Sequence, residues 1–139
     1  MKWITWERVG VDRISSAWLI KRFVDQDAGF QFVKKGTDVK NLEGIPFDIP
    51  GAVLSHKRGH CTFCTILREY SLKDVVLDLI CRIIDAADAL NDLLPPPEAA
   101  GLDAILRGLG KVFEDDHKTL EMGFIIMDAL YKQLREDCA

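Results

Sequence analysis

The sequence predicts a single α+β domain that is mainly helical, with about five helices and a small N-terminal β-sheet. Two observations lead to this fold class. Short segments rich in β-forming residues occur only before residue 57, whereas apolar residues recur at helical spacing through most of the later chain. In addition, no internal repeat, low-complexity segment or long linker divides the 139 residues, so we expect one domain over residues 1–139.

The expected sheet comes from short N-terminal segments. Residues 2–6 alternate and are rich in β-forming residues, and residues 29–33 alternate aromatic side chains, so both segments predict strands. Residues 52–56 could form a third strand. The segment before it, residues 44–51, contains two prolines and is therefore expected to be a loop or an edge strand.

Apolar residues at helical spacing predict five helices, over residues 12–24, 62–70, 73–91, 97–109 and 115–135. Asp12 is expected to be the N-cap of the first helix, because its short acidic side chain can accept hydrogen bonds from free backbone N–H groups. Pro97 suits the first turn of the fourth helix, where the N–H that proline lacks would have no intrahelical partner.

The distribution of charge along the chain indicates which classes of ligand it could bind. The net charge is −4, yet the first 35 residues carry seven Lys and Arg against four Asp and Glu. The acidic remainder argues against nucleic-acid binding by this chain alone, while the basic first part could attract a small anion. The sequence leaves open whether the chain forms an oligomer.

The expected location is the cytoplasm. No apolar run approaches the ~20 residues that span a bilayer, and the N-terminus has no apolar stretch of signal-peptide length. We therefore expect no membrane partner. In a reducing compartment the four cysteines are expected to be free thiols.

The last predicted helix carries a histidine and two carboxylates on one face. His117, Glu121 and Asp128 fall within a narrow wedge at about 100° per residue. Apolar residues flank this wedge, so Asp128 is predicted to be largely buried and hydrogen-bonded, ion-paired or bound to a metal. The competing interpretation is an exposed His117, a Glu121 that balances Lys118, and an Asp128 paired with an arginine.

The densest set of metal-binding residue types is His56-x3-His60-Cys61-x2-Cys64. These four residues could bind zinc as a Cys2His2 site, although the spacing differs from that of a zinc finger. The Cys-x-x-Cys could also be a redox pair, with Cys61 as the candidate thiol, but no surrounding βαβ pattern supports a thioredoxin-like fold. The remaining interpretation is a surface loop with small buried cysteines.

A second possible assembly takes one histidine from this loop and the other ligands from helices. His56 would meet His117 and Glu121, with Asp88 or Asp128 nearby. Two histidines and one or two carboxylates suit a divalent Zn, Fe or Mn ion and leave a position for water or an anion.

Two arginines bracket the first helix and could bind an oxyanion. Arg13 and Arg22 can both form forked hydrogen bonds, and Arg13 lies in the first helical turn, where the helix dipole favours anions. The alternative is an ion pair with a neighbouring aspartate, and this alternative suits Arg22 better than Arg13. The chain has no Gly-x-Gly-x-x-Gly, Walker, Gly-x-Ser-x-Gly or His-Glu-x-x-His motif, so nucleotide-binding and hydrolase functions have no support.

Five ordered blocks resemble the C-terminal domain of the chromate resistance protein ChrB family. They are DRISSAWLIKRFVD (12–25), IPFDIPG (45–51), HKRGHCTF (56–63), PEAAGL (97–102) and DDHKTLEMGFIIMDALY (115–131). With the spacing between them, the resemblance covers nearly the whole chain. It implies a role in bacterial chromate resistance; longer members place this domain after an N-terminal domain and act as chromate-responsive regulators.

The resemblance also implies which residues matter. The positions that match the family's characteristic residues are Arg13, Trp18, Arg22, His56, Cys61, Asp88, His117, Glu121 and Asp128. Asp85, His60 and Cys64 do not match such positions. Where the family usually has a small residue and Cys-Pro before the tryptophan, this chain has Ser15, Ser16 and Ala17, so no thiol role is expected there.

The sequence therefore favours a domain that binds a metal ion, an oxyanion or both, and that acts in binding or sensing. A redox-active metalloenzyme, for superoxide removal or chromate reduction, is the main alternative if the metal is Fe or Mn. A structural partner of a regulator is the second alternative.

Overall fold

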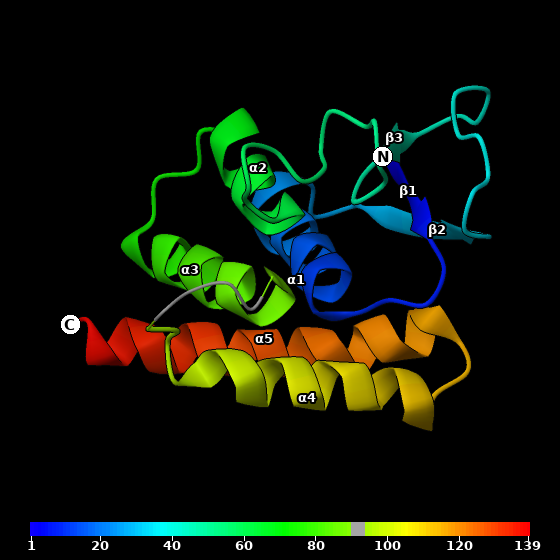
Figure 1. Ribbon diagram of the computed structural model, residues 1–139. Coiled ribbons are helices and arrows are strands. Elements are labelled where there is room, and N and C mark those ends of the chain that lie inside the picture. Colours follow the sequence, from blue (N-terminus) through cyan, green and yellow to red (C-terminus); the bar gives the residue numbers. More distant parts are fainter. Residues whose placement is uncertain (90–93) are drawn as a thin grey trace.

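The computed structural model describes residues 1–89 and 94–139, and it confirms the mainly helical α+β fold (Figure 1). Within these residues, five α-helices accompany a small three-stranded sheet at the N-terminus. None of the described helices combines the length and the apolar composition that crossing a membrane requires.

The sheet is parallel and has β1 at its centre. β1 (Lys2–Trp6) pairs with β2 (Gly29–Val33) on one side and with β3 (Ile45–Pro46) on the other. Pro46 lacks an N–H, which suits its place on an edge strand. The two strands predicted at residues 2–6 and 29–33 are confirmed.

The strand suggested for residues 52–56 is wrong, because this segment follows a turn. Leu54 forms only an isolated bridge with Phe47, and its carbonyl accepts a hydrogen bond of 2.7 Å from the Asp48 N–H. Asp48 has a positive φ of 53°, a conformation that reverses the chain locally. The turn brings the Asp48 and His56 side chains into contact with residues of the helical part.

All five predicted helices are present: α1 (Val11–Leu19), α2 (Thr62–Glu69), α3 (Val75–Ala89), α4 (Glu98–Val112) and α5 (Asp116–Asp137). A π-helical turn, η1 (Ile20–Val24), continues α1. Pro97 is the N-cap of α4. The last two residues of the helix predicted over 73–91 lie outside the described residues.

Asp12 is not the N-cap of α1, contrary to the prediction. Gly10 holds that position, and Asp12 lies in the first helical turn with its side chain buried. Its carboxylate accepts hydrogen bonds from the backbone N–H groups of Thr62 and Phe63, at the start of α2. A carboxylate from α1 thus satisfies free N–H groups of a different helix.

α1 is the centre of the helical part and contacts α2, α3, α4 and α5 (Figure 1). Its inward residues Ile14 and Trp18 are almost fully buried. α5 packs tightly against it at Gly123, where an added Cβ would lie 2.6 Å from Ile14 Cγ2. α4 and α5 lie side by side, and both pack against α1 and α3.

The expectation of four free thiols is wrong for two of them. Cys64 of α2 and Cys81 of α3 form a disulfide, because the packing of these helices brings their Cα atoms to 5.2 Å. Cys61 and Cys138 are free. The prediction of four free thiols followed from a reducing compartment alone, and the sequence does not reveal how α2 and α3 pack.

Candidate metal and oxyanion site

A cleft of about 1060 Å³ lies where the end of β1, the start of α1, the 48–56 loop and the end of α3 meet. Its lining mixes acidic, basic and imidazole groups. Its charged and imidazole residues include Asp12, Asp48, Asp88, His56, Arg8, Arg13 and Lys35. Both signs of charge in one cleft suit a site that holds a cation and an anion side by side.

Asp12 is the buried acid of this cleft, with only 4% of its side chain exposed. Burial favours the neutral carboxyl, but hydrogen bonds from His56, Thr62 N–H and Phe63 N–H hold the pKa of Asp12 below its ordinary value. Ser16 Oγ also donates to it, at 3.3 Å. Asp12 is therefore a carboxylate at neutral pH, held in place by the start of α2.

His56 lies between two carboxylates. Its Nε2 is 2.8 Å from Asp12 Oδ2 and 3.0 Å from Asp88 Oδ2. The hydrogen bond to Asp12, together with the charges of Asp12 and Asp88, raises the pKa of His56 to about 9. The imidazole is therefore protonated at neutral pH, and its positive charge sits where a metal cation would also be stabilised.

Asp48 adds a third carboxylate. Thr62 Oγ1 donates to Asp48 Oδ1 at 2.8 Å, and Arg13 Nε lies 3.0 Å from Asp48 Oδ2. Burial and the nearby charge of Asp12 raise the pKa of Asp48 to about 7. The pKa of Asp88 is raised by the same two causes. Both shifts thus come first from burial and then from the negative charge of Asp12.

Ligand atoms of Asp12, Asp48 and His56 all lie within 4.8 Å of one another. Asp88 contacts the same His56 nitrogen and completes a set of three carboxylates and one imidazole. Oxygen and imidazole nitrogen ligands suit Zn, Fe and Mn. A cation here would replace the His56 proton and relieve the repulsion among the acids.

The structure does not bring His117 and Glu121 to His56. The His117 ring packs edge-on against Phe32, with centroids 4.8 Å apart, and its backbone N–H is capped by Asp115. Glu121 exposes 65% of its side chain and lies near Lys118. Among the described residues, neither belongs to a group of potential metal ligands. The competing interpretation, an exposed histidine beside a Glu–Lys pair, describes this end of α5.

The reason lies in which stripe of α5 is buried. Leu120, Gly123 and Met127 belong to the buried stripe of α5, which packs against α1 at Gly123. This stripe lies roughly 100° around the helix from His117 and Glu121. The sequence pattern located the helix correctly but assigned the wrong edge of its apolar face to the core.

Asp128 is ion-paired but not largely buried, so the burial prediction is wrong and the pairing prediction is confirmed. Its side chain is 46% exposed. Arg22 donates to both of its oxygens, at 3.0 and 2.9 Å, and Trp18 Nε1 donates at 2.8 Å. The Arg22 hydrogen bonds keep the pKa of Asp128 below its ordinary value. Arg22 is therefore engaged by Asp128, and Arg13 is engaged by Asp48 in the cleft.

The Cys2His2 set in the 56–64 segment does not form either. His56 turns to Asp12, whereas His60 Nδ1 lies 2.7 Å from Asp85 Oδ2. Cys61 is buried, and burial raises the pKa of its thiol well above the ordinary range. A thiol in this state is a poor nucleophile, because the thiolate is the reactive form.

Sequence reasoning missed Asp12 and Asp48 as site residues. Asp12 looked like a helix cap, and Asp48 lies in a proline-punctuated loop without helical or strand periodicity. The only available signal for either was its position inside a block that resembles the ChrB family.

Comparison with known proteins agrees with that resemblance. The family model described as "ChrB, C-terminal domain" matches residues 3–134. Protein ChrB of Cupriavidus metallidurans is 30% identical over 133 residues, which cover 94% of this chain and 40% of that protein. The chain thus spans less than half the length of this relative. No solved structure gives a significant match. The chain belongs to the ChrB C-terminal domain family, which links it to chromate resistance.

Proposed function

We propose that this chain binds a divalent metal ion in its cleft and an oxyanion beside that ion, as the ligand-binding domain of a chromate-resistance protein. The observation that carries the proposal is the contact of one His56 nitrogen with two carboxylates, Asp12 at 2.8 Å and Asp88 at 3.0 Å. Asp48 lies within reach of the same point.

The charge of the cluster supports a cation. Three carboxylates and one imidazole lie close together, and burial together with the charge of Asp12 raises the pKa values of Asp48 and Asp88. A divalent ion would be attracted by these charges and would accept the His56 nitrogen once its proton leaves. Metal uptake should therefore release protons at neutral pH.

The basic edge of the cleft supports an anion. Arg8, Arg13 and Lys35 line it together with Trp6. Trp6 Nε1 and Arg13 Nε are buried donors without an aligned hydrogen-bond acceptor among the described residues. For Arg13 Nε, the 3.0 Å approach to Asp48 is thus an ion-pair contact and not an aligned hydrogen bond.

A bound metal would strengthen this preference for an anion. Once Asp48 binds the cation, Arg13 Nε loses its carboxylate partner, while Nη2 still donates to the Asp48 backbone carbonyl at 2.8 Å. The remaining guanidinium donors can then bind an oxyanion. The cation also adds positive charge beside it. Chromate and sulfate are the oxyanions to test; nucleic acid is not a proposed ligand of this chain, because its net charge is −4.

Metal identity separates binding or sensing from redox catalysis. Zinc is redox-inert and would favour a binding role, whereas Fe or Mn would keep the metalloenzyme alternative open. We expect metal analysis of freshly purified protein to find an ion of this group. Calorimetric titration of metal-stripped protein with Zn²⁺, Mn²⁺ and anaerobic Fe²⁺ should give binding with proton release for at least one of them.

The anion is tested in a second titration. Chromate and sulfate are added to metal-loaded and metal-stripped protein, and we expect tighter binding to the loaded form. Arg13→Lys keeps the positive charge but loses the planar guanidinium with its paired N–H donors, so it should weaken anion binding. Arg68→Lys, at the exposed end of α2, is the control and should leave anion binding unchanged. Absence of metal binding in every titration would contradict the proposed function.

A further inference from the structure

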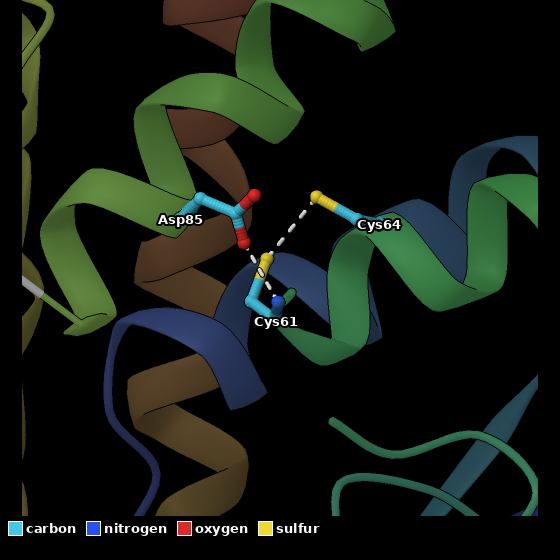
Figure 2. A group of neighbouring side chains, drawn as sticks. All are labelled: Cys61, Cys64 and Asp85. Atoms are coloured by element: carbon cyan, nitrogen blue, oxygen red, sulfur yellow. Dashed lines mark hydrogen bonds between the residues drawn. The ribbon is translucent and has the colours of Figure 1, made fainter. Parts of the chain in front are cut away.

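A second cluster of metal-binding residue types lies where the start of α2 meets α3. Ligand atoms of Cys61, Cys64 and Asp85 lie within 4.8 Å of one another (Figure 2). Cys64 also forms the disulfide to Cys81 of α3. The cluster thus holds two sulfur atoms and a carboxylate, with the Cys81 sulfur bonded to Cys64, and it shares no side chain with the cleft site.

Each of two helices supplies two of these groups. Cys61 and Cys64 are three residues apart at the first turn of α2, and Cys81 and Asp85 are four residues apart on α3. At these spacings both members of a pair lie on the same side of their helix. Two pairs of ligands, each pair a few residues apart, are typical of structural zinc sites.

The sulfur separation fits a metal centre. Cys61 Sγ lies 3.4 Å from Cys64 Sγ. Two sulfurs bound tetrahedrally to zinc at ~2.3 Å would be roughly 3.7 Å apart. A change of a few tenths of an ångström, within the freedom of a side chain, would bring these two atoms to that separation.

Asp85 is held in position by its neighbours. Its Oδ1 accepts the Cys61 backbone N–H at 2.7 Å, and its Oδ2 lies 2.7 Å from His60 Nδ1. A carboxylate oxygen that accepts one hydrogen bond still has a lone pair for a metal. Cys61 and Cys64 are buried, whereas Asp85 is 25% exposed and would offer an ion a route from solvent.

We propose that reduction of the Cys64–Cys81 disulfide creates a zinc site formed by the Cys61, Cys64 and Cys81 thiolates and the Asp85 carboxylate. In the reduction, a dithiol supplies two electrons and two protons, the Cys64–Cys81 bond breaks, and the dithiol becomes a disulfide. Zinc then binds the three sulfurs and displaces the thiol protons to water. A disulfide oxidant reverses this: the Cys64 and Cys81 thiolates re-form their bond, the oxidant takes up the two electrons and two protons from water and becomes a dithiol, and the ion leaves Cys61 and Asp85.

Cobalt(II) in place of zinc provides a direct test, because thiolate ligation produces a charge-transfer absorption in the near ultraviolet. The protein is reduced with a phosphine, desalted without oxygen and titrated with Co²⁺. We expect the absorption to rise to saturation at a single ion per chain and to disappear when Zn²⁺ is added. Protein left oxidised should show no such absorption.

Variants identify the ligands. Cys61→Ser should lower the absorption, because one of the three thiolates is lost, and Asp85→Asn should weaken Co²⁺ binding. Cys138→Ser, at the exposed C-terminal end, is the matched control and should behave like the unmodified chain. Circular dichroism checks that each variant is folded, and the comparison of reduced with oxidised unmodified protein needs no variant at all.

The outcomes separate this site from the cleft site. The cleft ligands contain no sulfur, so His56→Gln should leave the charge-transfer absorption unchanged, whatever becomes of the proposed function. No absorption in reduced protein, equal absorption in oxidised protein, or full absorption in folded Cys61→Ser would each overturn the proposal.

Discussion

His56 Nε2 lies 2.8 Å from the Oδ2 atom of Asp12, and this contact joins a loop residue to the first turn of α1, 44 residues earlier in the chain. The same Asp12 carboxylate accepts two N–H groups at the start of α2. Because it is buried and fixed by these bonds, Asp12 is the residue around which the cleft site is organised.

The Asp12–His56 pair should make the stability of the metal-free protein depend on pH. The pKa of His56 rises from 6.5 to about 9 in the folded state, so the folded protein holds this proton more tightly than the unfolded chain. The resulting stability is complete below pH 6.5 and is lost as the pH rises to about 9. Since the side chain is 58% exposed, we expect a modest fall in Tm across this range.

Asp12→Asn is the variant that checks this pH effect. It removes the main cause of the shift, so His56 should titrate nearer its ordinary value and the alkaline fall in Tm should shrink. Proton NMR titration of the three imidazoles measures this, with His117 as the internal reference on α5. An unchanged His56 pKa in a folded Asp12→Asn variant would show that Asp12 is not the cause.

Asp128 should matter for stability and not for metal binding. Asp128→Ala leaves Trp18 Nε1 and Arg22 without their acceptor, and after allowance for solvent screening we expect a loss of about 1–2 kcal/mol. Asp128→Asn keeps an acceptor for Trp18 and should cost less. Urea unfolding measures the difference, and equal losses in the two variants would contradict the role of the Trp18 hydrogen bond.

Adding even a methyl group at Gly123 should lower the stability of the protein. The added Cβ would meet Ile14 Cγ2 at 2.6 Å in the core between α1 and α5. Gly123→Ala should therefore cost about 1–3 kcal/mol, despite the better helix propensity of alanine. The matched control is Gly101→Ala on α4, which meets nothing within 4 Å and should stabilise the protein by about 0.5–1 kcal/mol. Thermal unfolding of both variants would reveal whether they change stability in opposite directions.

Periodicity was enough to predict the fold class, because long apolar stripes define α3, α4 and α5 regardless of what they pack against. It could not predict the site. Asp12 and Asp48 are 36 residues apart and meet at Thr62 only because a positive-φ turn at Asp48 directs the chain toward α2. On α5, the pattern did not distinguish the buried edge at Met127 from the exposed edge at Glu121.

The disulfide between Cys64 and Cys81 could not be predicted from the sequence for the same reason. Cys64 and Cys81 lie 17 residues apart on two helices whose packing sets the sulfur separation. Residue spacing along the chain places Cys61 and Cys64 on one helical turn, but the partner that reaches Cys64 comes from α3. Tertiary packing, and not local propensity, determines both ligand clusters.

In the proposed metal site, His56 and not His117 binds the ion together with Asp12, Asp48 and Asp88. The most direct test is calorimetric metal titration of two matched variants, His56→Gln and His117→Gln, each stripped of metal and shown to be folded. The geometry predicts that His117→Gln binds the ion like the unmodified chain, while His56→Gln loses at least tenfold in affinity. Metal binding that survives His56→Gln unchanged, or is lost in His117→Gln, would contradict the account.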